Sequence, residues 1–249
     1  TFQFQDHKEI LKYLSTHKLG EKNSTRFGVS RPGYYTDDTA MTLCLAKSLI
    51  EKGFDVVDQF RKYQMWANQG YMAANPKDGG FGIGQNTLNK LLNQKETEIP
   101  TDLGNVERAG GNGALMRCLP IGIVYHSDMA QIVDKSILSA IVTHNNKMAA
   151  YTCVVYNTLI SYILEDVPKE KLIEKLMKEE FTKDIPTELK ELLEDYTTGK
   201  ALLQKDLPSY GYTFNTLNIA LFSFFTTDDF ESAIELSIKC GGDTDTQAA

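Results

Sequence analysis

The chain has 249 residues, 42% of them hydrophobic and 24% charged, so it can bury the core of an ordinary globular domain. Its net charge of −7, with 26 scattered Lys and Arg residues, argues against a nucleic-acid-binding surface. The sequence contains neither an apolar run long enough to span a membrane nor an initial signal-peptide pattern, so we expect a soluble, cytoplasmic protein that acts on a small molecule or a protein.

Helical periodicity dominates the chain from beginning to end. Amphipathic spacing predicts a helix over 54–66, and apolar runs predict largely buried helices over 114–124 and 147–164. Residues 230–240 have apolar positions at helical spacing, and Gly241 and Gly242 provide the stop. Alternating strand patterns are hard to find, so we predict one all-α domain over residues 1–249.

Residues 165–206 are dense in Glu and Lys at helical spacing. This pattern predicts two amphipathic helices with solvated outer faces, and a partner-docking surface is the alternative.

The four cysteines are Cys44, Cys118, Cys153 and Cys240. They lie far apart in apolar stretches and form no CxxC pair. We therefore expect buried free thiols in a reducing compartment rather than a zinc site or a disulfide framework.

Two short clusters of Asp and Thr stand at the starts of expected helices: TDDT at 36–39 and DTDT at 243–246. Helix capping is the ordinary interpretation, and a capping box with Thr244 as N-cap and Gln247 three residues later fits the second cluster. If the clusters converge instead, their carboxylates would repel one another unless they are protonated or bind a cation. An oxygen-only ligand set suits Mg²⁺ or Mn²⁺ and not Zn²⁺.

Two glycine-rich segments, GGFGIGQNTL at 79–88 and RAGGNGALMR at 108–117, each lead into an expected helix. Such loops let backbone N–H groups approach a phosphate, although a tight interhelical turn explains them equally well. Neither segment is a P-loop, because no Gly-Lys-Ser/Thr follows.

His144 lies between two apolar helical runs. A capping or core histidine is the default interpretation, and a ligand contact at a helix junction is the alternative. We expect His7, His17 and His126 to be surface residues.

In order along the chain, these segments resemble the ADP-ribosylglycohydrolase family, which includes ADP-ribosylarginine hydrolases and the enzyme that reactivates dinitrogenase reductase. The matching segments are GYYTDDTAMTLCLAKSL, FGIGQNTL, AGGNGALMRCLPIGI, SAIVTHNNKMAA and the C-terminal stretch from GYTFNTL to GGDTDTQAA. The pairing of TDDT with a distant GGDTDT is the most specific part of the resemblance.

The resemblance implies a compact orthogonal multi-helix bundle in which a cleft at helix N-termini holds two Mg²⁺ ions and binds ADP-ribose. The positions that match the family's metal ligands are Thr36, Asp37, Asp38, Asp243, Asp245 and Thr246. The positions that match its ADP-ribose contacts are Gly110, Gly111, Asn112, Gly113 and His144, with Gly82 and Gly84 of the earlier loop as additions.

The implied activity is a Mg²⁺-dependent hydrolysis of the ribosyl bond of ADP-ribosylated protein side chains, on arginine or serine, or of small ADP-ribosyl conjugates. Asp38 is the expected proton acceptor for the attacking water, and Asp245 is the second expected catalytic carboxylate. The alternative is a binding module that keeps the fold and the ADP-ribose site without turnover.

The family pattern usually begins with a glycine-rich helix and a glutamate near the metals, whereas this sequence starts at TFQFQDHKEI and ends at QAA. Glu9 and Glu21 are poor matches to that glutamate by position. From the sequence we expect a domain truncated at both ends, with a weakened second metal site and little or no turnover.

Overall fold

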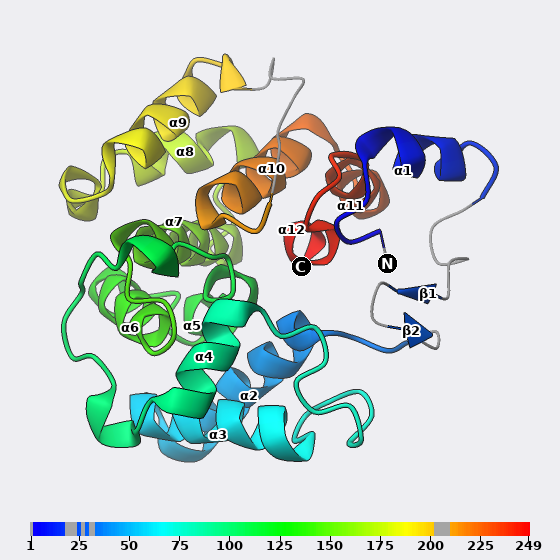
Figure 1. Ribbon diagram of the computed structural model, residues 1–249. Helices are drawn as coiled ribbons and strands as arrows, with labels where there is room; N and C mark the ends of the chain where they lie inside the picture. The colour runs from blue at the N-terminus through cyan, green and yellow to red at the C-terminus, as the bar shows by residue number, and fades with distance from the viewer. Residues whose placement is uncertain (1, 18–23, 26–27, 30–32, 202–209) are drawn as a thin grey trace.

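The structure is a computed structural model that describes residues 2–17, 24–25, 28–29, 33–201 and 210–249, and these are predominantly helical (Figure 1). The α-helices are α1 (His7–Leu14), α2 (Asp37–Lys52), α3 (Val56–Gln69), α4 (Gln85–Asn93), α5 (Leu119–Val124), α6 (Met129–Ile141), α7 (Lys147–Leu164), α8 (Leu172–Leu176), α9 (Thr187–Thr197), α10 (Thr213–Thr226), α11 (Phe230–Lys239) and α12 (Thr244–Ala248). Short 3₁₀ helices occur at η1 (Glu96–Glu98), η2 (Glu107–Ala109), η3 (Leu115–Arg117), η4 (Lys169–Lys171) and η5 (Glu180–Lys183). Two-residue strands β1 (Ser24–Thr25) and β2 (Gly28–Val29) pair antiparallel. The predicted all-α class is confirmed apart from this small hairpin.

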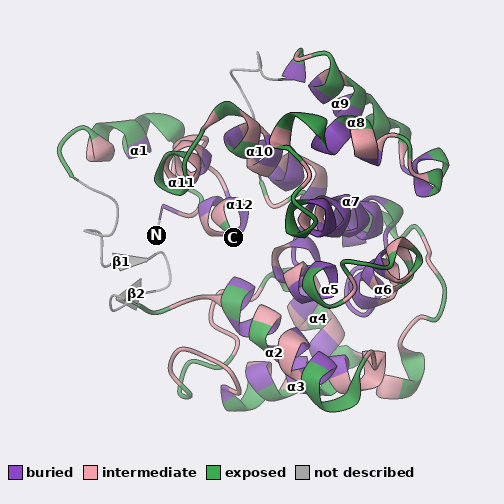
Figure 2. Ribbon diagram, turned by 180° about the vertical axis from the view of Figure 1, so that it is seen from behind, coloured by how far each residue is buried: buried purple, intermediate pink, exposed green. Residues whose placement is uncertain are grey.

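Helix α7 is the centre of the larger hydrophobic core. It is buried on most of its circumference, as its nearly continuous purple ribbon in Figure 2 shows. Helices α6, α8 and α10 pack around it, and α9 packs on α8. An 18-residue helix that is apolar on every side needs such a shell, because it has no face that water can solvate well.

A second hydrophobic core lies between α2 and α3. Cys44 and Leu45 of α2 pack with Phe60, Tyr63 and Trp66 of α3, and all five side chains are buried. This core holds the N-terminal end of α2, and therefore the TDDT segment, in a fixed position against the rest of the molecule.

Most of the helices expected from periodicity are present. Helices α3, α7 and α11 follow the predicted segments, and Gly241 and Gly242, both with positive φ, end the α11 segment as expected. The expected continuous helix over 114–124 is wrong: the chain forms η3 and then starts anew as α5. Pro120 explains the break, because proline is accepted in the first turn of a helix but not in its interior.

The charged segment forms the two amphipathic helices α8 and α9 where the structure describes it, up to residue 201. Their apolar side chains face the larger core, and their Lys and Glu side chains are mostly exposed. All four cysteines are free, and three of them are buried, whereas Cys240 is half-buried. Among the described helices, none has the combination of length and apolar composition that crossing a membrane requires.

Helix α12 lies beside the first residues of the chain. A β-bridge joins Gln5 to Gly242, and Figure 1 shows the two ends of the chain close together. The contact of α12 with α10 and α11 therefore places the DTDT segment next to the N-terminal residues and within reach of α2.

The close packing of α5 on α7 gives a stability prediction. A Cβ atom at Gly122 would lie 2.9 Å from Asn157 Oδ1 and 3.1 Å from the Asn157 carbonyl oxygen, so Gly122→Ala should lower the free energy of unfolding by about 1–3 kcal/mol. Ile123→Ala places an alanine on the same helix at an exposed position and should cost less than about 0.5 kcal/mol. Urea denaturation of both variants measures the difference, and equal stabilities would contradict the close packing.

Candidate functional site

The two Asp/Thr clusters meet although more than two hundred residues separate them. The Thr36 hydroxyl donates a 2.6 Å hydrogen bond to Asp38 Oδ2 and also contacts Asp245 Oδ2 at 3.4 Å. Thr36 precedes α2 and Asp245 lies in the first turn of α12, so the site is built where the N-terminal ends of two helices face each other.

Helix capping does not account for these residues. Neither Thr36 at the start of α2 nor Asp243 at the start of α12 makes a side-chain capping hydrogen bond. The predicted capping box is wrong, because Thr244 is already helical and Gln247 donates to the Gly241 carbonyl oxygen at 3.0 Å instead. Side-chain capping at the two N-cap positions therefore does not explain the clusters.

Asp243 is tied to the glycine-rich loop and to the N-terminal segment. Its Oδ2 accepts a 2.7 Å hydrogen bond from Asn112 Nδ2, and its Oδ1 accepts one of 3.0 Å from Gln3 Nε2. Asn112 also donates to Thr216 Oγ1 of α10 at 3.0 Å. These bonds connect the aspartate cluster to the loop at 110–113.

The cluster concentrates negative charge in a buried place. Burial raises the pKa of Asp37 well above its ordinary value, and the neighbouring Asp38, Asp245 and Asp243 raise it further. Burial also raises the pKa of Asp38, although its hydrogen bond from Thr36 opposes the rise. Burial and then Asp38 and Asp243 raise the pKa of Asp245 to about 8. Four carboxyl groups that repel one another are the electrostatic signature of a functional site.

A cavity of about 300 Å³ opens beside the cluster. Of the residues expected at the site, those lining it are Asp37, Gly82, Gly84, Gly111, Asn112, Gly113, His144, Asp243 and Thr246. Thr36, Asp38 and Asp245 do not line it, although Thr36 contacts both aspartates and the charges of Asp38 and Asp245 act on Asp37. Gly110 does not line it either: its carbonyl oxygen accepts from Thr213 N at 3.0 Å and anchors the loop to α10.

Glycine is required at two places: where the loop at 79–84 meets Asp37, and where the loop at 110–113 meets His144. Gly82 has φ +90°, and a Cβ atom there would collide with Asp37 Oδ1. A Cβ atom at Gly113 would lie 2.9 Å from His144 Cε1, and one at Gly111 would lie 3.3 Å from His144 Nε2. The two glycine loops therefore allow the backbone to form the cavity wall directly.

The loop at 110–113 rests on a buried cation. Arg117 of η3 is fully buried and donates to the Gly113 carbonyl oxygen at 2.8 Å and to Thr143 Oγ1 at 2.7 Å. Its guanidinium also lies over the Tyr63 ring at 4.7 Å. Burial, then the charges of Arg117 and Lys90, lower the pKa of His144 to about 3, so this histidine is neutral at physiological pH.

Some cavity residues were not among the expected site residues. They are Gln3 and Phe4 before α1, Asn86 and Thr87 at the start of α4, and Tyr210 and Gly211 before α10. Asn86 and Thr87 lie within the glycine-rich segment 79–88, and Gly211 begins the matching stretch GYTFNTL, so their membership of these segments was the available signal. Gln3, Phe4 and Tyr210 belong to no such segment, and only the tertiary contacts reveal them. Glu9 is exposed on α1 and does not line the cavity.

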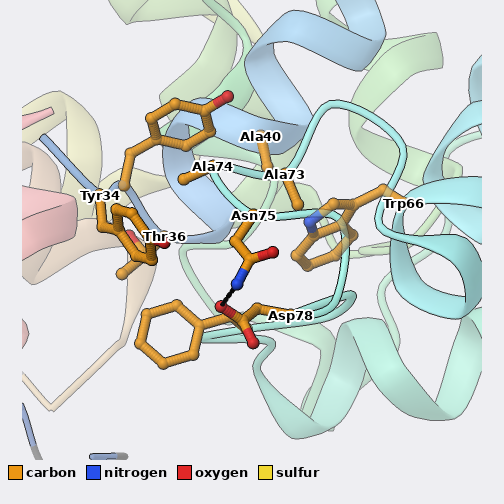
Figure 3. Close-up of a pocket in the computed structure, with 10 residues that line it drawn as sticks. Tyr34, Thr36, Ala40, Trp66, Ala73, Ala74, Asn75 and Asp78 are labelled. Atoms are coloured by element: carbon orange, nitrogen blue, oxygen red, sulfur yellow. Dashed lines mark hydrogen bonds between the residues drawn. The ribbon is translucent and has the colours of Figure 1, made fainter. Parts of the chain in front are cut away.

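A second, much smaller cavity lies near Thr36 (Figure 3). Its volume of about 10 Å³ provides room for about one water molecule. Asn75 Nδ2 donates to Asp78 Oδ2 at 2.9 Å at this cavity, and Trp66 and Ala40 form its apolar part. The cavity is too small for a substrate group.

The oxygen atoms of the aspartate cluster suit a hard cation, but the arrangement of the carboxylates does not form a complete metal-binding group. Asp38 Oδ1 and Asp245 Oδ1 are buried and have no hydrogen-bond partner among the described residues, and the expected ligand atoms of the cluster are carboxylate and hydroxyl oxygens. Among the described residues, however, no group of three or more His, Cys, Asp or Glu side chains is arranged so that it could hold a metal ion. Hydroxyls and water molecules would have to complete the coordination, as is usual for Mg²⁺.

Comparisons with known proteins identify the family of this chain. A model of the family described as ADP-ribosylglycohydrolase matches residues 1–249. The chain is 29% identical to an ADP-ribosylarginine hydrolase of Serratia proteamaculans over 243 residues, which is 96% of this chain and 64% of that protein. It is 27% identical to an ADP-ribosyl-dinitrogen reductase glycohydrolase of Rhodospirillum rubrum, covering 100% of this chain and 76% of that protein. The chain therefore spans about two thirds to three quarters of the length of these relatives.

A solved structure has the same fold. It is described as an ADP-ribosylglycohydrolase-related protein complex, and it superposes with a TM-score of 0.72 at 27% identity over 94% of this chain and 74% of that one. With a family match over its whole length and a shared fold, the chain belongs to the ADP-ribosylglycohydrolase family.

Proposed function

We propose that this chain hydrolyses the bond between ADP-ribose and an acceptor group, in a reaction that depends on Mg²⁺. The observation that carries the proposal is the meeting of Asp37 and Asp38 with Asp243 and Asp245 at a cavity walled by glycine backbone. The names of the relatives support the reaction class, since each describes the removal of ADP-ribose.

Mg²⁺ is the cation that these residues suit best, with Mn²⁺ as a substitute. The residues that would hold two ions are Thr36, Asp37, Asp38, Asp243, Asp245 and Thr246. A bound cation would supply a partner to the oxygens of Asp38 and Asp245 that have none among the described residues, and its charge would oppose the rise in the pKa of these carboxyl groups. When bound, such ions orient the ribose hydroxyls and lower the pKa of a water molecule.

The glycine loops are the proposed site of the ADP portion. Gly111 and Gly113 carry no side chain of their own at the cavity, and this allows a diphosphate to approach the backbone beside Asn112 and His144. Neutral His144 adds a ring nitrogen to the same wall. The ADP portion would then extend away from the aspartates, with the ribose of the reacting bond beside Asp37.

The reaction adds one water across the ribosyl bond. The water oxygen bonds to the anomeric carbon, the bond from that carbon to the acceptor nitrogen or oxygen breaks, and the acceptor leaves with a proton. Ionised Asp38 is the proposed acceptor of the water's proton, and Asp245 is the second catalytic carboxylate. The acceptor is arginine or serine in this proposal: the name of the Serratia proteamaculans relative supports arginine, and serine is the alternative that the family resemblance implies.

The decisive experiment follows the release of ADP-ribose from arginine-linked and serine-linked peptides, with Mg²⁺ or with EDTA. Release that requires Mg²⁺ supports the proposal, and the preferred peptide identifies the acceptor. Binding of ADP-ribose without release from either peptide would instead identify a binding module.

The first prediction for this site concerns the catalytic carboxylates. Asp38→Ala and Asp245→Ala should each reduce turnover by about 100-fold or more and weaken Mg²⁺ binding, because each removes a proposed ligand and a proton acceptor. Asp228→Ala removes an exposed carboxylate and should leave both properties unchanged. Full activity in a folded Asp38→Ala variant would refute the assignment.

The second prediction concerns stability without metal. A carboxyl group whose pKa is raised on folding stabilises the protein below its unfolded pKa near 4, and this stabilisation is lost as the pH rises through its folded pKa. For Asp245 this loss of stability extends to about pH 8. In EDTA at pH 8.5, the free energy of unfolding of the Asp245→Asn variant should therefore exceed that of the wild type by about 1 kcal/mol or more. The advantage should shrink toward pH 4, where the wild-type carboxyl is protonated.

Thermal unfolding in EDTA at several pH values measures this difference. Asp228→Asn is the matched control at an exposed position and should follow the wild type at every pH. A variant that is less stable than the wild type at high pH would mean that the carboxylates are not under mutual repulsion.

The third prediction concerns the glycine loop. A side chain at Gly111 would enter the space between His144 Nε2 and Asn86 Nδ2, which lie 3.3 Å and 3.4 Å from the position of its Cβ atom. Gly111→Val should therefore weaken ADP-ribose binding by about tenfold or more, and Gly111→Ala by less. Calorimetric titration with ADP-ribose tests the series, and unchanged affinity in a folded Gly111→Val variant would remove the loop from the binding site.

A further inference from the structure

The side chain of His144 stands at the end of a chain of hydrogen bonds that begins at a buried arginine. Arg117 Nη2 lies 2.7 Å from Thr143 Oγ1, and the same hydroxyl oxygen lies 2.8 Å from His144 Nδ1. All three side chains are buried, at 0%, 1% and 2% exposure, so water does not compete for these bonds.

The direction of each bond follows from the donor inventory. A guanidinium has only donors, so the Thr143 oxygen must accept from Arg117. The single hydroxyl proton of Thr143 is then satisfied if it points to His144 Nδ1, and in the described part of the chain that oxygen has no further hydrogen-bond partner. If Nδ1 carried the ring proton, the hydroxyl proton of Thr143 would be buried without an acceptor among the described residues, which is unfavourable.

The opposite ring nitrogen faces the glycine loop. His144 lines the 300 Å³ cavity, and its Nε2 lies 3.3 Å from the Cβ position of both Gly111 and Gly113. No hydrogen bond engages Nε2 within the described residues. A ligand oxygen against the loop is therefore the natural partner of this nitrogen.

We infer that Arg117 and Thr143 are positioning residues that hold neutral His144 with its proton on Nε2, so that the ring presents a fixed hydrogen-bond donor to a ligand oxygen in the cavity. The cations that act on the ring are Arg117 of η3 and Lys90 of α4, and both oppose a second proton on it. The same arginine donates to the Gly113 carbonyl oxygen. One buried cation therefore fixes both the backbone of the glycine loop and the orientation of the His144 donor. The identity of the ligand rests on the proposed function, whereas the tautomer does not.

Nitrogen NMR of ¹⁵N-histidine-labelled protein tests the tautomer directly, without any ligand. The chain has four histidines, and the other three, His7, His17 and His126, are exposed. The signals lost in His144→Gln identify this ring. We expect the Nε2–H tautomer with no titration between about pH 5 and 8. A proton on Nδ1, or titration near the ordinary histidine pKa, overturns the inference.

Variants test the role of the hydroxyl. Thr143→Val should produce a mixture of tautomers and raise the ADP-ribose Kd and the KM about tenfold, with kcat little changed, because the donor acts on a part of the ligand remote from the reacting bond. Thr143→Ser restores the hydroxyl and should restore both the tautomer and the affinity. Ser139→Ala is the matched control, since it deletes a buried hydroxyl beside Arg117 but leaves the carbonyl oxygen that the arginine binds at 3.3 Å.

The outcomes separate this inference from the proposed function. Equal loss of affinity in Thr143→Val and Ser139→Ala, or no rescue by serine, would overturn the positioning role. If Thr143→Val does not fold, the wild-type spectrum still decides the tautomer, and the Thr143→Ser affinity decides whether a hydroxyl suffices. If the wild type shows the Nε2–H tautomer but does not bind ADP-ribose, the proposed function and the ligand contact fail, and the assignment of the tautomer stands.

Discussion

The mutual repulsion of buried carboxyl groups is the constraint on which the rest of the site depends. Asp37, Asp38, Asp243 and Asp245 lie together in a place where burial already disfavours their charged forms. A fold keeps such a cluster only if the surrounding structure holds the groups in position. Here the α2–α3 core fixes one pair, and the packing of α12 against α10 and α11 fixes the other.

Positive ends of dipoles partly offset the repulsion. Asp37 and Asp38 occupy the first turn of the 16-residue helix α2, where the aligned peptide dipoles favour negative charge. Amide donors from Asn112 and Gln3 satisfy both oxygens of Asp243. Within the described part of the chain, one oxygen each of Asp38 and Asp245 has no hydrogen-bond partner, so these two groups are the part of the cluster that the proposed cation would stabilise most.

A buried cation organises the other half of the cavity. Arg117 has no carboxylate partner within the described residues, and it binds carbonyl oxygens, a hydroxyl and an aromatic face instead. Because Arg117 pairs with none of the aspartates, its charge does not neutralise them directly. Its hydrogen bond to the Gly113 carbonyl oxygen fixes the backbone of the glycine loop. The aspartate cluster, which is the proposed reaction side, is thus separated from a wall of backbone and neutral side chains that suits the proposed anionic ligand.

The sequence by itself determined the helical class, because apolar residues recur at helical spacing in α3, α7 and α11 and strand alternation is scarce. It also indicated the convergence of TDDT with DTDT, because the family resemblance implies a metal-ligand set that draws on both clusters. Local rules predicted the boundaries less well: Pro120 divides an expected helix, and the expected capping box at Thr244 does not form. Only the tertiary structure decided that Gln3 and Asn112 bind Asp243, and that Arg117 reaches His144 through Thr143. These partners lie on different elements, and their contacts depend on how whole helices pack, a property that neither spacing nor composition encodes locally.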